Sequence, residues 1–111
     1  MTYLLKDLAK QLTNGTITAR SLVEDCLAAI DAPDGEGKRA FIETYHNRAR
    51  EEADAVDQAR KQGLSLPTFA GIPLSIKDLF DEADTVTRAG SKVLKDATPA
   101  IKDAAVLTRL K

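Results

Sequence analysis

The sequence predicts helices up to residue 62, interrupted by one short strand, and a second short strand after them, which is the pattern of an α/β protein. Segments with apolar residues at helical spacing occupy most of that first part. Two short runs, residues 40–45 and 74–76, carry β-forming residues instead. Hydrophobic residues make up 43% and charged residues 30% of the 111 residues, which is the composition and size of one small globular domain.

Two helices are predicted before a loop at residues 31–37. Thr2 would cap the first helix, and Asn14-Gly15 would end it because both residues tolerate the left-handed conformation of a helix stop. Thr18 would cap the second helix. The two apolar stripes are Leu4, Leu5, Leu8 and Leu12, and then Leu22, Val23, Cys26, Leu27 and Ile30.

The chain contains one cysteine and one histidine, which limits its chemistry. Cys26 is in line with Leu22 and Ile30 at spacings of four, so we expect a buried small hydrophobic residue rather than a nucleophile. His46 lies in a polar stretch and is expected at the surface. One residue of each type falls short of the three or four ligands of a zinc site, and a single cysteine forms no internal disulfide.

Opposite charges four residues apart predict a solvent-facing helix over residues 47–62, which Gly63 ends. The pairs are Arg48/Glu52, Arg50/Asp54 and Asp57/Lys61. The thin apolar face of this helix consists of small residues around Ala53, which would allow close packing on a neighbour.

The second half of the chain is expected to be less regular. Residues 74–76 are predicted to form a short strand that leads to Lys77, and residues 81–99 to be irregular. Residues 101–111 have helical character, and that pattern continues to the last residue.

The charge balance argues against several classes of partner. The chain has 16 Lys and Arg residues, 17 Asp and Glu residues and a formal net charge of −1. Proteins that neutralise many phosphates normally carry an excess of basic residues, so neither direct nucleic-acid binding nor anionic-membrane binding is expected. No apolar run has the length of a signal peptide or a membrane span, so the cytoplasm is the expected location.

Lys77 is the candidate for chemistry because it follows an apolar strand. A lysine accepts a proton only when neutral, and its pKa in water is about 10.4, so a closed apolar site must lower it. Taken alone, the signal is weak because lysines at strand ends are usually solvated. Asp78 and Asp81 are expected to face water or cap a helix rather than to form a catalytic pair.

Residues 69–78 (FAGIPLSIKD) and 87–91 (TRAGS) resemble the lysine segment of the amidase signature family. In that family a Gly-Ile/Val-Pro turn leads into a buried strand ending in Lys-Asp, and a Thr-x-x-Gly-Ser turn follows. Residues 102–110 (KDAAVLTRL) also resemble the helix that comes next.

The resemblance implies that residues 1–111 are the N-terminal part of a single amidase domain. That parent would be an α/β protein with a mixed central sheet covered by helices. Its parts in this chain would be a helical region at 1–62, a lysine-bearing strand and loop at 66–99, and a truncated helix at 101–111.

The resemblance also implies an activity. Family members hydrolyse a carboxamide to a carboxylate and ammonia, or supply the amidase subunit of a glutamyl/aspartyl-tRNA amidotransferase. They use a Ser-Ser-Lys triad, in which Lys77 would be the base, with no metal or organic cofactor. The implied partner is a small-molecule amide substrate, and a homodimer of the full-length parent is left open.

The catalytic serines of the family lie in a Gly/Ser-rich stretch, which has no counterpart among the four serines of this chain: Ser21, Ser65, Ser75 and Ser91. Ser75 is expected to be packed or bonded to backbone, and Ser91, by the resemblance, to shape the surroundings of the lysine. Because a triad acts as a unit, we expect the 111-residue chain alone to hydrolyse nothing. The non-enzymatic alternative is a truncated, inactive helical interaction module.

Overall fold

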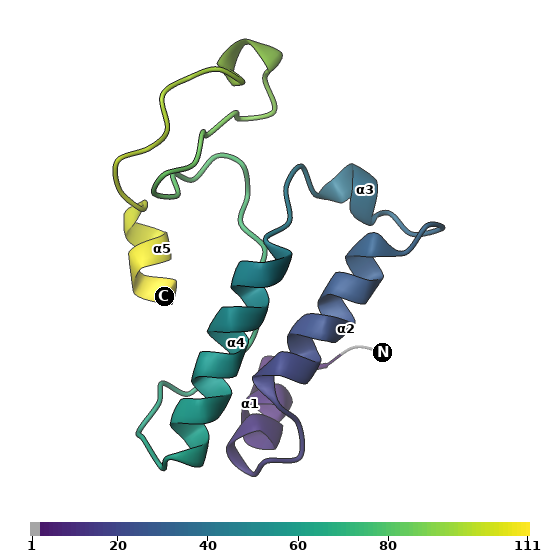
Figure 1. Cartoon of the computed structure of the whole chain (residues 1–111), viewed down its shortest axis with the longest axis vertical. Helices are drawn as coiled ribbons and strands as arrows, with labels where there is room; N and C mark the ends of the chain where they lie inside the picture. The colour runs from purple at the N-terminus through teal and green to yellow at the C-terminus, as the bar shows by residue number, and fades with distance from the viewer. Residues whose placement is uncertain (1–2) are drawn as a thin grey trace. The chain divides into compact units, whose positions relative to one another are not determined.

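The computed structural model describes residues 3–111, so the predicted cap at Thr2 lies outside the described residues. The chain divides into two compact units, and the described residues of each are 3–73 and 74–111. Figure 1 shows that the first unit holds the long helices and that the second is mostly irregular chain.

The first unit contains four helices, and their positions agree with most of the predicted helical pattern. They are α1 (Leu5–Thr13), α2 (Ala19–Asp31), α3 (Gly37–Ala40) and α4 (His46–Lys61). The ends of α1 and α4 follow the predicted stop signals, because Gly15 and Gly63 have φ angles of +77° and +74°. These left-handed conformations are accessible to glycine without strain.

The start of α2 is a reciprocal cap between Thr18 and Ser21. The Thr18 hydroxyl accepts the Ser21 N–H at 3.0 Å, and the Ser21 hydroxyl oxygen accepts the Thr18 N–H at 3.2 Å. The predicted cap at Thr18 is therefore confirmed. Because both donors would otherwise lack a partner at the helix end, this pairing defines where α2 begins.

The core of the first unit lies between α1, α2 and α4. Its buried residues are Leu12, Ala19, Val23, Leu27 and Ala53. Three of them recur at spacings of four along α2, so the buried stripe of that helix is narrower than predicted.

Cys26 is exposed, so the prediction of a buried cysteine is wrong. Consecutive residues of an α-helix are about 100° apart around the axis. Because Leu27 lies on the buried stripe, Cys26 is turned away from it. His46, the only histidine, is partly exposed, and its Nε2 atom lies 2.8 Å from a carboxylate oxygen of Asp31.

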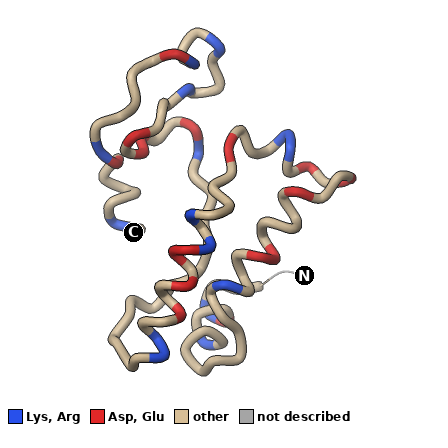
Figure 2. The backbone as a smooth tube through the Cα atoms, viewed as in Figure 1, with Lys and Arg blue, Asp and Glu red and all other residues tan. Residues whose placement is uncertain are grey.

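Helices α2 and α4 lie side by side and share a set of charged contacts. Arg20 contacts Glu24 at 2.8 Å and Asp54 at 2.6 Å, and Arg50 contacts Glu24 at 2.8 Å. Hydrogen bonds from Arg50 and Arg20 lower the pKa of Glu24 to about 2. Figure 2 shows charges of both signs along these two helices.

The charge pairs predicted within α4 are therefore only partly correct. Arg48 and Glu52 do pair, at 3.0 Å. Arg50 instead pairs with α2, as described above, and Asp57 accepts the N–H groups of Ala19 and Arg20 at 2.8 and 2.9 Å. A side chain of α4 thus caps the N-terminus of α2, a contact that sequence spacing within one helix does not reveal.

In the second unit, η1 (Lys92–Leu94) is a short 3₁₀ helix and α5 (Ala105–Leu110) a short α-helix. Two hydrogen bonds join the segment before η1 to the segment after it: the Asp84 N–H donates to the Ala100 carbonyl at 2.9 Å, and the Ala100 N–H donates to the Thr85 carbonyl at 3.0 Å. The helix predicted for residues 101–111 is therefore present but begins later, at Ala105.

The predicted strands are wrong, and with them the α/β class and the mixed sheet: residues 3–111 form helices and irregular segments only. Of residues 40–45, the first ends α3 and the rest lead to α4, while residues 74–76 are irregular. A strand needs a neighbouring strand to bond its N–H and C=O groups. β-Forming side chains alone do not supply those bonds.

The close approach of Gly71 to α2 and α4 leads to a testable difference between two glycines. Gly71 and Gly63 both have left-handed φ angles, +94° and +74°. A Cβ added at Gly71 would lie 2.8 Å from the Cβ of Ala19 and 3.2 Å from Cγ1 of Val56, whereas one added at Gly63 would meet nothing within 4 Å. Ala19 is fully buried, so α2 has no free space into which it could shift.

We therefore expect Gly71→Ala to destabilise the protein more than the matched control Gly63→Ala. Both substitutions place a side chain in a left-handed conformation, at a cost of about 1 kcal/mol. Gly71→Ala adds an overpacking cost of about 1–3 kcal/mol. Urea unfolding followed by circular dichroism measures both free energies, and equal midpoints for the two variants would contradict the close packing of Gly71.

Candidate functional site

Lys77 lies in the second unit, and its side chain is exposed. Its carbonyl accepts the N–H of Leu79 at 2.7 Å and the N–H of Phe80 at 3.1 Å, so the chain turns directly after the lysine. Ser75 is also exposed, and its hydroxyl makes no hydrogen bond within residues 3–111, so the prediction of a packed or backbone-bonded hydroxyl is wrong. The closed apolar surroundings expected around the amine are therefore not present at Lys77 in this chain.

Asp78, the next residue, contacts the TRAGS segment. One of its carboxylate oxygens accepts the Arg88 N–H at 2.9 Å, and the other accepts the Gly90 N–H at 3.2 Å. These hydrogen bonds from backbone N–H groups lower the pKa of Asp78 below its usual range. The two parts of the sequence motif, ten or more residues apart, thus meet through this carboxylate.

The TRAGS segment forms a tight turn at residues 88–91. The Ser91 N–H donates to the Arg88 carbonyl at 2.8 Å and closes the turn. The two central residues, Ala89 and Gly90, have φ angles of +49° and +70°. Two successive left-handed residues are the feature of a type I′ turn, in which alanine is strained and glycine is not.

Two further side chains shape the same region. A carboxylate oxygen of Asp81 accepts the Thr87 hydroxyl at 2.7 Å. The Ser91 hydroxyl accepts the Val93 N–H at 3.2 Å and so caps η1. The first and last residues of TRAGS are thus each held by a hydrogen bond of their own.

Asp81 is exposed, as predicted, and Asp78 is half-buried. Both also accept hydrogen bonds from residues of the TRAGS segment, which the sequence analysis did not predict. One signal in the sequence could have indicated the donors of this contact, but not the carboxylate that they bind. A Gly-containing turn directs consecutive N–H groups to one side, and such a group of donors calls for a nearby anion.

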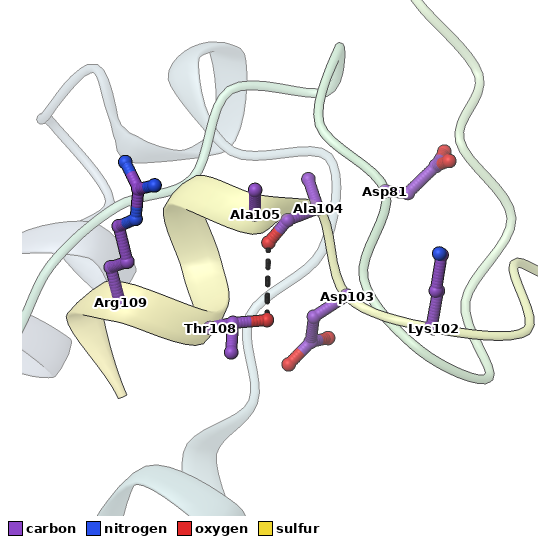
Figure 3. A pocket seen from close by; sticks show the side chains of 7 residues that line it. All are labelled: Asp81, Lys102, Asp103, Ala104, Ala105, Thr108 and Arg109. Carbon is purple, nitrogen blue, oxygen red and sulfur yellow. Dashed lines mark hydrogen bonds between the residues drawn. The ribbon is translucent and has the colours of Figure 1, made fainter.

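An open hollow of about 420 Å³ lies beside α5 in the same unit. Figure 3 shows Arg109 at the opposite side of this hollow from Asp81 and Lys102. The residues that line it are Asp81, Lys102, Asp103, Ala104, Ala105, Thr108 and Arg109. Charges of both signs line it, and Asp103 is already engaged by the Ala83 N–H and the Lys111 amine, each at 2.8 Å.

Two features are absent from the described part of the chain. Within residues 3–111, no group of three or more His, Cys, Asp or Glu side chains is arranged to hold a metal ion. No helix in that range is long and apolar enough to cross a membrane.

Comparison with known proteins identifies the family of this chain. The family model named Amidase matches residues 21–111, which include Lys77, Asp78 and the TRAGS turn. The chain therefore belongs to the amidase family, as the resemblance of the lysine segment indicated.

Individual relatives agree with this assignment. The chain is 41% identical over 105 residues to AtzE, a 1-carboxybiuret hydrolase subunit of Pseudomonas sp. (strain ADP), covering 95% of this chain and 23% of that protein. It is 43% identical over 90 residues to a glutamyl-tRNA(Gln) amidotransferase subunit of Synechococcus sp. (strain WH7803), covering 81% of this chain and 18% of that protein.

A solved structure resembles the chain in three dimensions. It belongs to a vestigial protein complex described as revealing the evolutionary origins of an s-triazine catabolic enzyme. It matches with a TM-score of 0.85 and 40% sequence identity, over 94% of this chain and 22% of that one. The chain thus spans about a fifth of the length of the proteins that it matches.

Proposed function

We propose that residues 1–111 are the N-terminal part of a single amidase domain and that Lys77 is the base of a Ser-Ser-Lys mechanism. The reaction would convert a carboxamide and water into a carboxylate and ammonia. The observation that supports the proposal most directly is that the family match includes Lys77 and the turn that its neighbour Asp78 contacts.

The roles of the parts follow from general acid–base chemistry. The lysine would take a proton from a relay serine, which would in turn activate the serine nucleophile. Donors placed where charge develops would stabilise the tetrahedral intermediate. Both serines would lie in residues that this chain does not contain, so the chain by itself supplies only the base.

A second candidate function is the amidase subunit of a tRNA-dependent amidotransferase. It is favoured by the relatives named as glutamyl-tRNA(Gln) amidotransferase subunits, in Synechococcus and in Rhodopirellula baltica, where the match extends over all 111 residues at 37% identity. These relatives and the 1-carboxybiuret hydrolase relative are all named as subunits. We therefore propose that the full-length gene product assembles with other chains, in the cytoplasm.

Release of ammonia tests the proposal and the expected inactivity of the isolated chain. We expect the full-length gene product to release ammonia from a panel of small carboxamides. We expect the 111-residue chain to release none under the same conditions, because none of its four serines is a proposed member of the triad. Ammonia release by the 111-residue chain would overturn the assignment of the nucleophile to other residues. A full-length product that acts on no carboxamide, alone or with its partner chains, would favour the non-enzymatic module.

A further inference from the structure

The contact between Asp78 and the turn at residues 88–91 is more specific than an ordinary surface hydrogen bond. Successive N–H groups in a turn with left-handed residues form a concave site for an anion. In this chain the Asp78 carboxylate occupies that site, with one oxygen on the Arg88 N–H and the other on the Gly90 N–H. The turn also contains a left-handed alanine, Ala89, which needs surrounding contacts to persist.

The Asp78 contact directly follows Lys77 in the chain and restrains the backbone of the lysine. Its carbonyl is engaged by the N–H groups of Leu79 and Phe80, and the residue that follows it is bonded to the turn through both carboxylate oxygens. Within residues 3–111, no hydrogen bond or ion pair involves the Lys77 amine. The backbone is therefore the part of Lys77 that hydrogen bonds hold in place.

We propose that Asp78 is a positioning residue for Lys77: its carboxylate binds the N–H groups of the 88–91 turn and so fixes the backbone from which the lysine projects. The proposal rests on the proposed role of Lys77 as a base. As a positioning residue, Asp78 itself touches neither the substrate nor the reacting atoms.

The ionised form of Asp78 is the one that makes the contact. Because the N–H groups of Arg88 and Gly90 lower its pKa in the folded protein, the stabilisation is fully present above the usual range of an aspartate. It is lost as the pH falls through the lowered pKa, where the carboxyl group becomes protonated. An amide side chain at this position retains one acceptor oxygen but directs an NH₂ donor at the second N–H.

The first test measures the contact itself by NMR in the 111-residue chain, with Asp78→Asn and the control Asp96→Asn. Asp96 is an exposed aspartate of the same unit that forms an ion pair with Lys95 at 3.9 Å. During a titration from about pH 7 to about pH 2.5, the amide signals of Arg88 and Gly90 should move together, with a midpoint below the usual aspartate range of about 3.9.

Asp78→Asn should abolish these movements and shift the backbone signals of Lys77, whereas Asp96→Asn should leave both unchanged. The proposal is overturned if the Arg88 and Gly90 signals titrate in Asp78→Asn as in the parent, or if the Lys77 signals are the same in both. This outcome does not depend on whether the protein hydrolyses amides.

The second test is kinetic and uses the full-length gene product. Misplacing a catalytic group by about 1 Å can lower a rate about 100-fold, so Asp78→Asn should lower kcat about 10–100-fold and leave KM within about twofold. Asp96→Asn should leave both constants unchanged. A general loss of folded protein would lower the active fraction without a shift of the Lys77 signals, and melting curves measure that fraction.

Different results would contradict the role of Lys77 as the base and the role of Asp78 as a positioning residue. If Lys77→Ala abolishes hydrolysis but Asp78→Asn retains the parental kcat, the positioning role is wrong and the base assignment stands. If Lys77→Ala retains hydrolysis, the base assignment is wrong, and the NMR titration alone then decides whether Asp78 holds the turn and the Lys77 backbone.

Discussion

Replacing Lys77 with alanine in the full-length gene product should lower kcat for carboxamide hydrolysis on the order of 10⁴-fold, because the members of a catalytic triad act as a unit. Lys77→Arg should be almost as inactive. Arginine keeps the positive charge and the length of the side chain but is not deprotonated in proteins, so it does not serve as a base. Initial rates of ammonia release measure both effects.

Lys92→Ala is the matched control for this experiment, since Lys92 is an exposed lysine of the same unit outside the Lys77 segment and the turn. It should retain the parental kcat. Circular dichroism confirms that each variant is folded. Retention of more than about a tenth of the rate by Lys77→Arg would show that the lysine acts through its charge and not as a base.

Replacing Leu12 with alanine should destabilise the first unit by about 2–5 kcal/mol, the usual cost of removing a fully buried leucine side chain. Leu12 is 1% exposed and is the largest side chain buried so completely among the described residues. It packs in the cluster that includes Ala19 and Ala53. The side chains of these two alanines are too small to fill the cavity that the substitution would leave. Urea unfolding of the 111-residue chain, followed by circular dichroism, measures the loss.

Leu5→Ala tests whether burial, rather than helix propensity, causes this effect. Leu5 lies in the same helix and is 60% exposed, so its substitution should change the free energy of unfolding by only about 0.5 kcal/mol. Both substitutions replace leucine with alanine in α1, so they share the change of residue type and differ in burial. Coincident unfolding midpoints would mean that the core around Leu12 is not formed in solution.

Helices α1, α2 and α4 of the first unit could be predicted because their signals are local, whereas α3 was not predicted. The cap at Thr18 and the stops at Gly15 and Gly63 each act within one turn of the helix that they bound. The exposure of Cys26 could not be predicted from its spacing to other apolar residues, since the width of the buried stripe depends on the helices packed against α2.

The strand predictions were wrong because a strand depends on contacts that are not local. Residues 40–45 and 74–76 have β-forming side chains, but a strand is defined by bonds to another segment, and the described residues contain no such pairing at either place. Likewise, Arg50 was predicted to pair with Asp54 and Asp57 with Lys61, both within α4. Instead, Arg50 and Asp57 contact α2. Each of these errors concerns a partner that is distant in the sequence.

The sequence alone was sufficient to indicate the family, because the resemblance depends on the order and spacing of residues in two short segments that the family match includes. The role of Lys77 as the base stays a prediction. Only the tertiary structure decided what Asp78 does: its carboxylate bonds N–H groups of Arg88 and Gly90, which follow it by 10 and 12 residues. Backbone N–H groups are present at every position except proline, so no residue pattern reveals which of them converge on one carboxylate. Their convergence is set by the left-handed turn, and a turn is a property of the folded chain.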